Sequence, residues 1–281
     1  MHWTDIETPL LDAFREGLVI PAHPLALDSN RSLDRARQRA LSRYYIDAGA
    51  GGLAVGVHTT QFAIRDVGLY APVLSLAAST ARDWAKKRVF MVAGVAGPTG
   101  QALEEARTAA ALGYHASLLS LAALKNASED ELIEHCAAVA EVMPAIGFYL
   151  QTAVGGRRLS RDFWRRFAAI ENVIGIKMAP FNRYATLDVV RGVVEAHAEK
   201  RVTLYTGNDD HIVLDLVSKT RIMRDGNAVD VTIAGGLLGH WSVWTKGAAG
   251  ILARCKAARQ SGAVPDDILR LDAAITDCNA A

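Results

Sequence analysis

Short apolar runs rich in β-branched residues alternate with amphipathic stretches along the chain, and this alternation constrains the fold more than any other feature. We predict eight strands, over residues 18–22, 52–57, 89–95, 116–120, 145–149, 173–177, 202–206 and 231–234. The stretches between them predict helices, over residues 32–48, 64–86, 99–112, 128–142, 160–170, 184–198 and 209–218. Strands joined by helical crossovers pair in parallel, so eight such units favour an α/β fold, the closed (β/α)8 TIM barrel. An open, doubly wound sheet is the alternative.

The chain also predicts additions to the barrel. Residues 1–239 are expected to form the barrel itself, with one extra helix over residues 4–17 before the first strand. Residues 240–281 are rich in alanine and leucine, which predicts additional C-terminal helices packed on the barrel. Residues 219–230 are polar and rich in turn formers, which predicts an insertion before the last strand.

Charge and hydropathy exclude several classes of protein. The formal net charge of +1 gives no electrostatic reason to expect binding to nucleic acid. No apolar run reaches the roughly 18 residues that a membrane-spanning helix needs. The first residues, Met1–Glu7, lack the basic head and apolar centre of a secretory signal, and the three cysteines form no CxxC pair. We therefore expect a cytoplasmic protein with no nucleic-acid partner and no membrane partner.

The run Asn172–Pro180 places a lysine, Lys177, at the carboxyl end of a predicted strand. Ammonium groups are seldom buried without a partner, so a lysine at this position requires an explanation. Burial lowers the pKa of a lysine, and the neutral amine can attack a carbonyl carbon to form a Schiff base. At the ordinary pKa only about one amine in a few thousand is neutral at pH 7, so this role requires a pKa of roughly 7. The alternative is a lysine whose charged end reaches solvent from the strand end.

Active sites of (β/α)8 barrels gather at the carboxyl ends of the strands. Tyr149 ends the fifth predicted strand and Lys177 the sixth, so we expect both side chains to point into one cavity. Because side chains alternate along a strand, Gly147 is expected on the side of Tyr149, and Gly175 on the side of Lys177. Such glycines would leave room for a small ligand, although a tapering barrel interior explains them equally well. A buried structural tyrosine is the alternative for Tyr149.

Histidines and carboxylates near the strand ends raise the alternative of a metal-dependent barrel enzyme. The residues concerned are His23, His58, Asp209, Asp210, His211 and His240. They form no tight ligand motif such as HExxH, and the glycines of residues 49–54 precede a strand where a dinucleotide fingerprint would follow one. We therefore expect neither a metal nor a cofactor.

At its strand ends the chain resembles the dihydrodipicolinate synthase and N-acetylneuraminate lyase family of class I, Schiff-base aldolases. Gly175-Ile176-Lys177 is similar to the family's G-x-K strand end, whose lysine forms the Schiff base. Phe148-Tyr149 is similar to the strand end with the family's catalytic tyrosine, and Tyr149 precedes Lys177 by 28 positions, as in the family. The resemblance implies that Lys177 attacks the carbonyl of a 2-oxo acid and that Tyr149 shuttles protons.

Two further segments resemble the family's substrate-binding segments. Residues 56–60 stand where the family has a Gly-Thr-Thr-Gly-Glu loop, and residues 206–209 resemble its Gly-Asp loop after the seventh strand. The resemblance implies that His58, Thr59, Thr60, Gly207 and Asp209 of these segments bind the substrate, and we expect Gly235, which follows the last predicted strand, to do so as well.

The loop of residues 56–60 departs from the family pattern at the positions that hold the substrate carboxylate. Val57 and His58 stand where the family has its paired threonines, and Thr59 and Thr60 are displaced by one step. Either the chain shifts in register so that Thr59 and Thr60 serve, or His58 is a new donor for a different anion or a neutral carbonyl.

Two other departures make dihydrodipicolinate synthase itself an unsuitable identity. Val154 stands in place of the synthase branch's arginine, and residues 121–124 lack the tyrosine that some members receive from a neighbouring subunit. We therefore expect a divergent aldolase or dehydratase that acts on a small-molecule carbonyl substrate. Because family members are commonly homo-oligomers, we expect a homodimer or homotetramer. A non-catalytic ligand-binding barrel of the same family is the alternative function.

Overall fold

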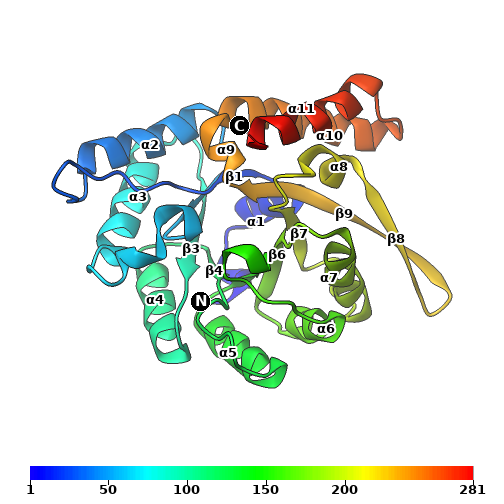
Figure 1. The fold of residues 1–281 in the computed structure, drawn as a ribbon, viewed down its shortest axis with the longest axis horizontal. Helices are drawn as coiled ribbons and strands as arrows, with labels where there is room; N and C mark the ends of the chain where they lie inside the picture. Colours follow the sequence, from blue (N-terminus) through cyan, green and yellow to red (C-terminus); the bar gives the residue numbers. More distant parts are fainter. Residues whose placement is uncertain (281) are drawn as a thin grey trace.

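Eight parallel strands form the wall of a barrel in the computed structural model, which describes residues 1–280 (Figure 1). Their order around the wall is β1-β9-β7-β6-β5-β4-β3-β2. Hydrogen bonds from His23 N to Ala54 O (2.8 Å) and from Gly51 N to Val19 O (3.0 Å) join the two ends of this path. The predicted (β/α)8 barrel is therefore confirmed. The wall strands are β1 (Val19–Pro21), β2 (Gly52–Val55), β3 (Phe90–Val95), β4 (Ala116–Leu119), β5 (Ala145–Leu150), β6 (Val173–Ala179), β7 (Thr203–Thr206) and β9 (Asn227–Leu238).

Helices surround this wall and extend it at the C-terminal end. Those of the barrel are α1 (Thr8–Glu16), α2 (Arg35–Asp47), α3 (Tyr70–Trp84), α4 (Thr99–Ala111), α5 (Glu129–Val142), α6 (Arg161–Ala169), α7 (Arg183–Glu195) and α8 (Ile212–Val217). They are followed by α9 (His240–Val243), α10 (Thr245–Ser261) and α11 (Asp266–Ala280). The additional C-terminal helices are thus present, and α10 and α11 lie side by side along one edge of the molecule (Figure 1). Within the described residues, no helix has the length and apolar character to cross a membrane.

Local sequence signals explain where several helices begin. The Ser128 hydroxyl accepts a hydrogen bond from Glu131 N (3.2 Å), and the Glu131 carboxylate accepts one from Ser128 N (2.7 Å), which completes a capping box at the start of α5. The Ser160 hydroxyl accepts a hydrogen bond from Phe163 N (3.0 Å) at the start of α6. Both caps satisfy amide groups that the first turn of a helix otherwise leaves without partners.

Residues 219–230 form a β-hairpin, where the sequence predicts a turn-rich insertion. β8 (Lys219–Arg224) runs antiparallel to the first half of β9, and only the second half of β9 belongs to the barrel wall. Asp225 and Gly226 both have positive φ angles, of 51° and 78°, as a two-residue hairpin turn requires. The hairpin projects from the body of the barrel beside α7 and α8 (Figure 1).

The barrel interior is filled at the amino-terminal ends of its strands. The Phe14 ring of α1 stacks between the rings of Phe90 (4.6 Å between centroids) and Tyr205 (4.8 Å). The Tyr205 hydroxyl donates a hydrogen bond to Phe14 O (2.7 Å) and accepts one from Leu18 N (3.0 Å). This end of the barrel is therefore closed by α1, and a ligand can reach the interior only from the carboxyl ends of the strands.

Candidate active site

The side chain of Lys177 points into the barrel near the carboxyl end of β6. It is only 8% exposed, and its Nζ lies 4.3 Å from the centroid of the Phe148 ring on the neighbouring strand β5. Among the described residues, Nζ makes no hydrogen bond and no ion pair. Gly207 allows this position, because a Cβ atom there would come within 2.7 Å of Lys177 Cε. The lysine is therefore held by contacts along its stem while its amine has no partner.

The environment of Lys177 favours the neutral amine. Burial lowers its pKa from 10.5 to about 8, and the negative charge of Asp209 opposes this shift. At pH 7 about a tenth of such amines are neutral, compared with about one in a few thousand at the ordinary pKa. The ring face of Phe148 partly stabilises the charged form that remains.

Tyr149 does not share the barrel interior with Lys177, and the predicted convergence of Tyr149 with Lys177 is wrong. Its ring packs 5.0 Å from the Trp164 ring of α6, outside the barrel wall. Its hydroxyl donates to Leu159 O and accepts from Leu159 N, both at 3.4 Å. The reason is strand alternation: Phe148 faces the barrel interior, so its neighbour Tyr149 faces the helices.

The two glycines of the prediction also have packing roles. Gly147 faces outward like Tyr149, and a Cβ atom there would collide with Phe167 and Trp164 of α6. Gly175 faces the interior, where the Phe14 ring of α1 fills the space beneath Lys177. Neither glycine opens a cavity for a ligand.

The segment His58–Thr60 forms a short 3-10 helix after β2, and its side chains divide between two tasks. Thr60 is fully buried, where its hydroxyl donates to His23 O (2.6 Å) and accepts from Gly56 N (3.0 Å). His58 is exposed, and its pKa is lowered by partial burial and by the charge of Lys177, which places it near the lysine. Thr59 is half-buried beside it. The Thr60 hydroxyl is therefore occupied by the backbone, while the His58 side chain is exposed near Lys177.

Asp209 follows Gly207 closely in the loop after β7. Its Oδ1 atom is buried and has no hydrogen-bond partner among the described residues. Burial raises the pKa of its carboxyl group, while the positive charges of Lys177 and His240 oppose the rise. Lys177 and Asp209 are thus close enough to affect each other's ionisation without forming an ion pair.

Gly235 has a packing role in the structure. It pairs with Tyr205 across β7 and β9, and a Cβ atom there would meet the Leu18 backbone at 2.5 Å and the Tyr205 ring at 2.9 Å. The space that a side chain would take is therefore filled by protein.

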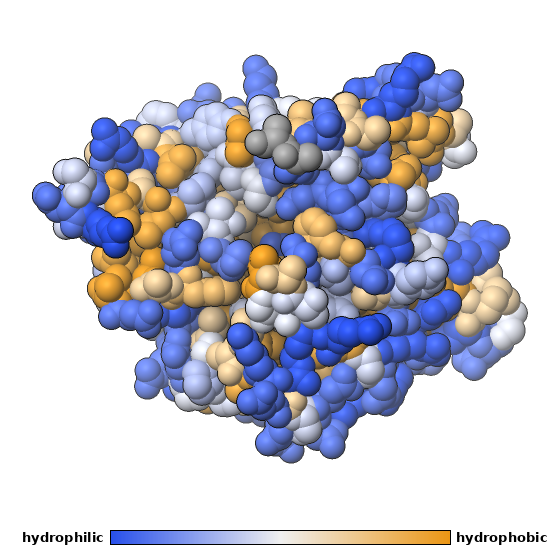
Figure 2. All heavy atoms as spheres, in the orientation of Figure 1, coloured by the Kyte–Doolittle hydropathy of each residue, from blue (hydrophilic) through white to orange (hydrophobic). Residues whose placement is uncertain are grey.

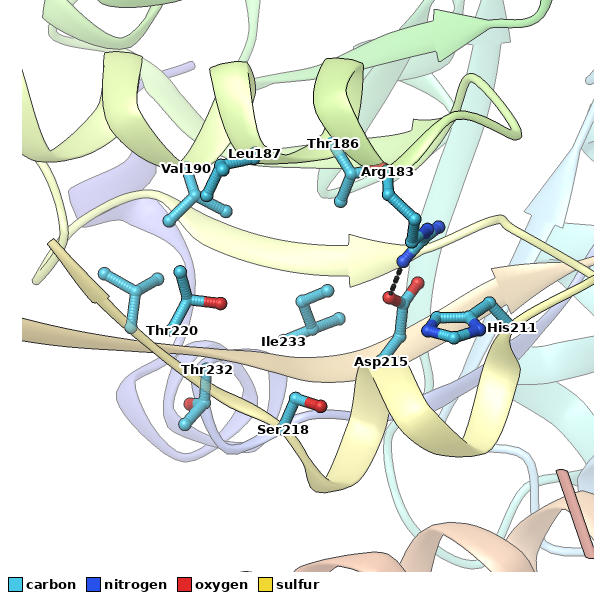
Figure 3. Close-up of a pocket in the computed structure, with 11 residues that line it drawn as sticks. Arg183, Thr186, Leu187, Val190, His211, Asp215, Ser218, Thr220, Thr232 and Ile233 are labelled. Atoms are coloured by element: carbon cyan, nitrogen blue, oxygen red, sulfur yellow. Dashed lines mark hydrogen bonds and ion pairs between the residues drawn. The ribbon is translucent and has the colours of Figure 1, made fainter. Parts of the chain in front are cut away.

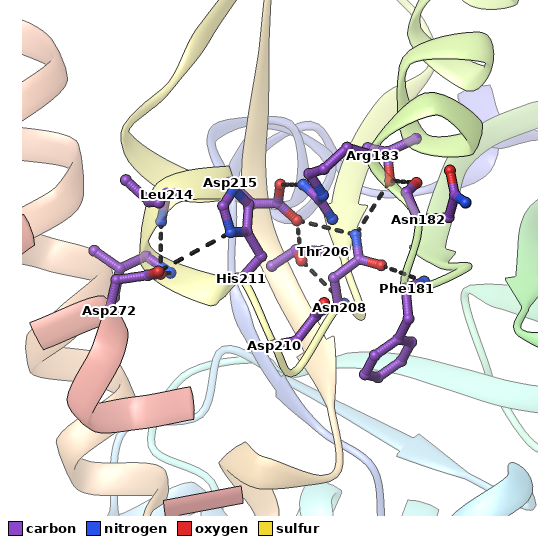
Figure 4. A network of polar contacts seen from close by, with 12 residues as sticks. Phe181, Asn182, Arg183, Thr206, Asn208, Asp210, His211, Leu214, Asp215 and Asp272 are labelled. Carbon is purple, nitrogen blue, oxygen red and sulfur yellow. Dashed lines mark hydrogen bonds and ion pairs between the residues drawn. The ribbon is translucent and has the colours of Figure 1, made fainter. Parts of the chain in front are cut away.

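A buried polar network that the sequence did not reveal fixes the loop after β7 (Figure 4). The Asp215 carboxylate of α8 accepts hydrogen bonds from Arg183 Nη1 (2.5 Å), Thr206 Oγ1 (2.6 Å) and Asn208 Nδ2 (3.1 Å). Asn208 Oδ1 in turn accepts from Phe181 N (3.0 Å), in the loop after β6. The loops that follow β6 and β7 are therefore tied to each other.

The C-terminal helix α11 holds the same loop from the other side. Asn279 Nδ2 donates to Asp209 O (2.8 Å), and Thr276 Oγ1 donates to Asp210 O (3.1 Å). The Asp272 carboxylate accepts hydrogen bonds from Val213 N (3.0 Å) and Leu214 N, and so caps α8 from a different helix (Figure 4). These contacts join segments that lie about sixty to seventy positions apart, so no local pattern predicts them.

The cavity in Figure 3 is separate from the site at Lys177. It has a volume of about 260 Å³ and lies outside the barrel wall, between α7, α8 and the hairpin. Arg183, His211 and Asp215 line its polar end, and Leu187 and Val190 line its apolar wall. The Arg183–Asp215 pair thus borders this cavity while it supports the loop that carries Asp209.

The residues of the metal alternative do not gather at one point. His23 Nε2 pairs with Ser42 Oγ (2.8 Å) on α2, and His240 Nδ1 pairs with Asn279 Oδ1 (2.7 Å) on α11. In the part of the chain that the structure describes, no three histidine, cysteine or acidic side chains form a cluster suited to a metal ion.

The fold and the position of Lys177 place the chain among (β/α)8 barrels with a buried lysine at the mouth. The model of the Dihydrodipicolinate synthetase family matches residues 16–219. The chain therefore belongs to the dihydrodipicolinate synthetase family.

Curated relatives match part of their own length. Over 151 residues the chain is 32% identical to the "Probable 5-dehydro-4-deoxyglucarate dehydratase" of Acinetobacter baumannii, a match that covers 53% of this chain and 46% of the relative. Over 198 residues it is 29% identical to the 4-hydroxy-tetrahydrodipicolinate synthase of Aromatoleum aromaticum, covering 68% of this chain and 62% of the relative. The chain thus matches less than two thirds of either relative.

Solved structures share the fold. CdNal from Clostridium difficile, solved in complex with mannosamine, superposes with a TM-score of 0.76 at 16% identity, over 93% of this chain and 81% of that chain. The dihydrodipicolinate synthase of Acinetobacter baumannii, complexed with pyruvate, gives a TM-score of 0.75 at 19% identity, with the same coverage of both chains. At these identities the likeness concerns the fold alone.

The lowered pKa of Lys177 predicts that this residue weakens the folded state at neutral pH. In the unfolded chain the Lys177 amine keeps its proton up to about pH 10.5, whereas in the folded chain the amine loses its proton above about pH 8. The buried lysine therefore lowers the free energy of unfolding by about 3 kcal/mol below pH 8, and this loss disappears as the pH rises toward 10.5.

We expect Lys177→Met to raise the free energy of unfolding by about 2–3 kcal/mol at pH 7, with a gain that shrinks between pH 8 and 10.5. Urea unfolding at a series of pH values measures this, with the exposed Lys125→Met as the matched control. Equal effects of the two substitutions at every pH would contradict a pKa lowered by burial.

Proposed function

We propose that this protein is a Schiff-base-forming lyase, an aldolase or a dehydratase, that acts on a 2-oxo acid or a related carbonyl compound through Lys177. The observation that carries the proposal is the buried side chain of Lys177 at the carboxyl ends of the strands of a (β/α)8 barrel. Its amine has a pKa of about 8 and no hydrogen-bond or ion-pair partner among the described residues. Dihydrodipicolinate synthase itself is not the activity we propose.

The chemistry follows from the state of the amine. The neutral nitrogen of Lys177 attacks the carbonyl carbon, a C–N bond forms, and the carbonyl oxygen leaves as water. The protonated imine then withdraws electrons from the adjacent carbon, which supports cleavage of a C–C bond or loss of a C–O substituent. The face of the Phe148 ring, over which the Lys177 nitrogen lies, would stabilise the positive charge of the imine in the same way as that of the ammonium group.

The side chains near the barrel mouth suit an anionic or polar substrate, although the arginine of the synthase branch is missing. His58 is exposed near Lys177 and is placed to donate to a carboxylate or carbonyl oxygen. Val154, at the position of the synthase branch's arginine, is 44% exposed in a short 3-10 helix after β5. Relatives named as a dehydratase and as a synthase, and a fold neighbour complexed with pyruvate, agree with a small carbonyl substrate.

One observation favours the alternative of a ligand-binding barrel without catalysis. The aromatic side chain beside Lys177 is Phe148, which has no hydroxyl group to move protons. A barrel that kept the lysine without a proton-transfer group would bind a carbonyl compound reversibly and turn nothing over.

Trapping with borohydride tests the proposed function. Incubation with a 2-oxo acid such as pyruvate, followed by reduction, is expected to add one stable mass to the peptide that contains Lys177. Lys177→Arg is expected to abolish the adduct, because a guanidinium group stays protonated and cannot attack. Mass spectrometry of the digested protein locates the adduct.

Two matched variants complete the experiment. Exposed Lys125→Arg is expected to leave the adduct unchanged, and Tyr149→Phe is expected to leave the trapping rate within about threefold, since its hydroxyl bonds only to Leu159 outside the barrel. An adduct on another lysine would exclude Lys177 as the nucleophile. Trapping without turnover of any 2-oxo acid would favour the ligand-binding barrel.

We also propose that the chain assembles as a homodimer or homotetramer. Tyr44, Val243 and Trp244 are all at least 44% exposed, and the Tyr44 hydroxyl donates to Val243 O (3.0 Å), which brings them together at one surface. Figure 2 shows further hydrophobic surface gathered over the side of the molecule where α3 lies. Burial of such surface against a second copy is favourable. Light scattering at micromolar concentration is expected to give a multiple of 30.2 kDa, and a monomer mass would contradict the proposal.

A further inference from the structure

We propose that Asp209 is the group that transfers protons during Schiff-base formation on Lys177. The inference rests on the proposed function and adds a catalytic role that Tyr149 cannot fill from its position outside the barrel.

The surroundings of Lys177 leave few groups for this task. Phe148 has no hydroxyl, and the Thr60 hydroxyl is engaged with His23 O and Gly56 N. The titratable side chains whose charges interact with that of Lys177 are Asp209 and His58. Of these two, His58 is exposed at the mouth, and Asp209 is the more buried.

The carboxyl group of Asp209 has one oxygen atom without a partner in the described part of the chain. Its Oδ1 atom is buried and has no hydrogen-bond partner among the described residues. A buried acceptor without a partner is costly, so its persistence calls for a functional explanation. A bound substrate oxygen that carries a proton would supply the missing partner.

The backbone around Asp209 is fixed, while the Oδ1 atom of its carboxyl group has no hydrogen-bond partner among the described residues. Gly207 lies against the stem of Lys177, and Asn208 is held by Asp215 and by the backbone of Phe181 (Figure 4). On the other side, Asn279 donates to the carbonyl oxygen of Asp209 (2.8 Å). The loop therefore aims the carboxyl group without using either of its oxygens in the side-chain network.

The protonation state of Asp209 allows it both to give a proton to the reacting groups and to take one from them. Burial and the neighbouring Asp210 raise its pKa, whereas Lys177, His240 and a backbone contact of His240 lower it. When the amine of Lys177 has become part of a neutral carbinolamine, its opposing charge is gone, so the acid form of Asp209 becomes more stable. When the imine later carries a positive charge, the carboxylate form is favoured again.

The proton balance closes with one carboxyl group. Attack by the neutral amine gives a positive nitrogen and a negative oxygen. The Asp209 acid protonates this oxygen, and its carboxylate then takes a proton from the nitrogen, which leaves a neutral carbinolamine. The acid next protonates the hydroxyl, the C–O bond breaks as water departs, and the nitrogen lone pair forms the protonated imine beside the Asp209 carboxylate.

The rate of pyruvate trapping in Asp209→Asn separates this role from a purely electrostatic one. The charge of Asp209 holds the pKa of Lys177 up, so its removal increases the fraction of neutral amine at pH 7. A purely electrostatic role therefore predicts faster trapping, whereas a proton-transfer role predicts trapping slower by about 100- to 10,000-fold. Asp225→Asn, at the exposed turn of the hairpin, is the matched control and is expected to trap within about threefold of the wild type.

Chemical rescue of the trapping rate gives a second test. If Asp209 had only a structural role, an added acid would not restore the rate. Asp209→Ala is expected to regain trapping rate in proportion to added formate or acetate, because a small acid in the vacated space can carry the proton. Retention of the wild-type rate in Asp209→Asn, or a slow Asp209→Ala without rescue, would overturn the inference and leave the proposed function intact. A wild-type protein with no Lys177 adduct from pyruvate, 2-oxobutanoate or 2-oxoglutarate would overturn both.

Discussion

The burial of the Lys177 side chain, whose amine has no hydrogen-bond or ion-pair partner among the described residues, is the constraint on which the rest of the site depends. Lys177 enters the barrel interior from β6, rests on the ring of Phe148 and passes Gly207, where a side chain would block it. Burial then lowers its pKa to about 8, which makes the amine a usable nucleophile near neutral pH. A structural lysine in the same place would gain stability from an ion pair, and none is present among the described residues.

The groups around this amine come from distant parts of the chain. Polar contacts between the loops after β6 and β7, α8 and α11 hold them in place. Asp215 ties the loops after β6 and β7 together, and α11 fastens the Asp209 loop through Asn279 and caps α8 through Asp272. The C-terminal helices therefore do more than cover apolar surface. They hold the backbone of the loop that carries Asp209, whose negative charge interacts with that of Lys177.

The barrel and the inward position of Lys177 could be predicted because both depend on short-range patterns. Alternating strands and helices impose parallel pairing, and a lysine in an otherwise apolar strand end marks the inside of the mouth. The direction of Tyr149 could not be predicted in the same way. β5 is buried on both faces, so hydrophobicity does not distinguish its inner from its outer residues. In addition, the pairing of β5 with β6 shifts in register between Ala145 and Ile146, which no sequence pattern indicates. The hairpin could have been predicted, since Asp225-Gly226 is a strong turn signal. The contacts of Asp272 and Asn279 could not, because they join segments far apart in the chain.

The pKa of Lys177 tests this account most directly. Trace labelling of the folded protein with a limiting amine reagent over a range of pH, read by mass spectrometry, gives the midpoint at which each lysine becomes reactive. The account predicts a midpoint of about 8 for Lys177, well below that of the exposed lysines. A midpoint near 10.5 would show an ordinary ammonium group at the barrel mouth, and the proposed Schiff-base chemistry would lose its physical basis.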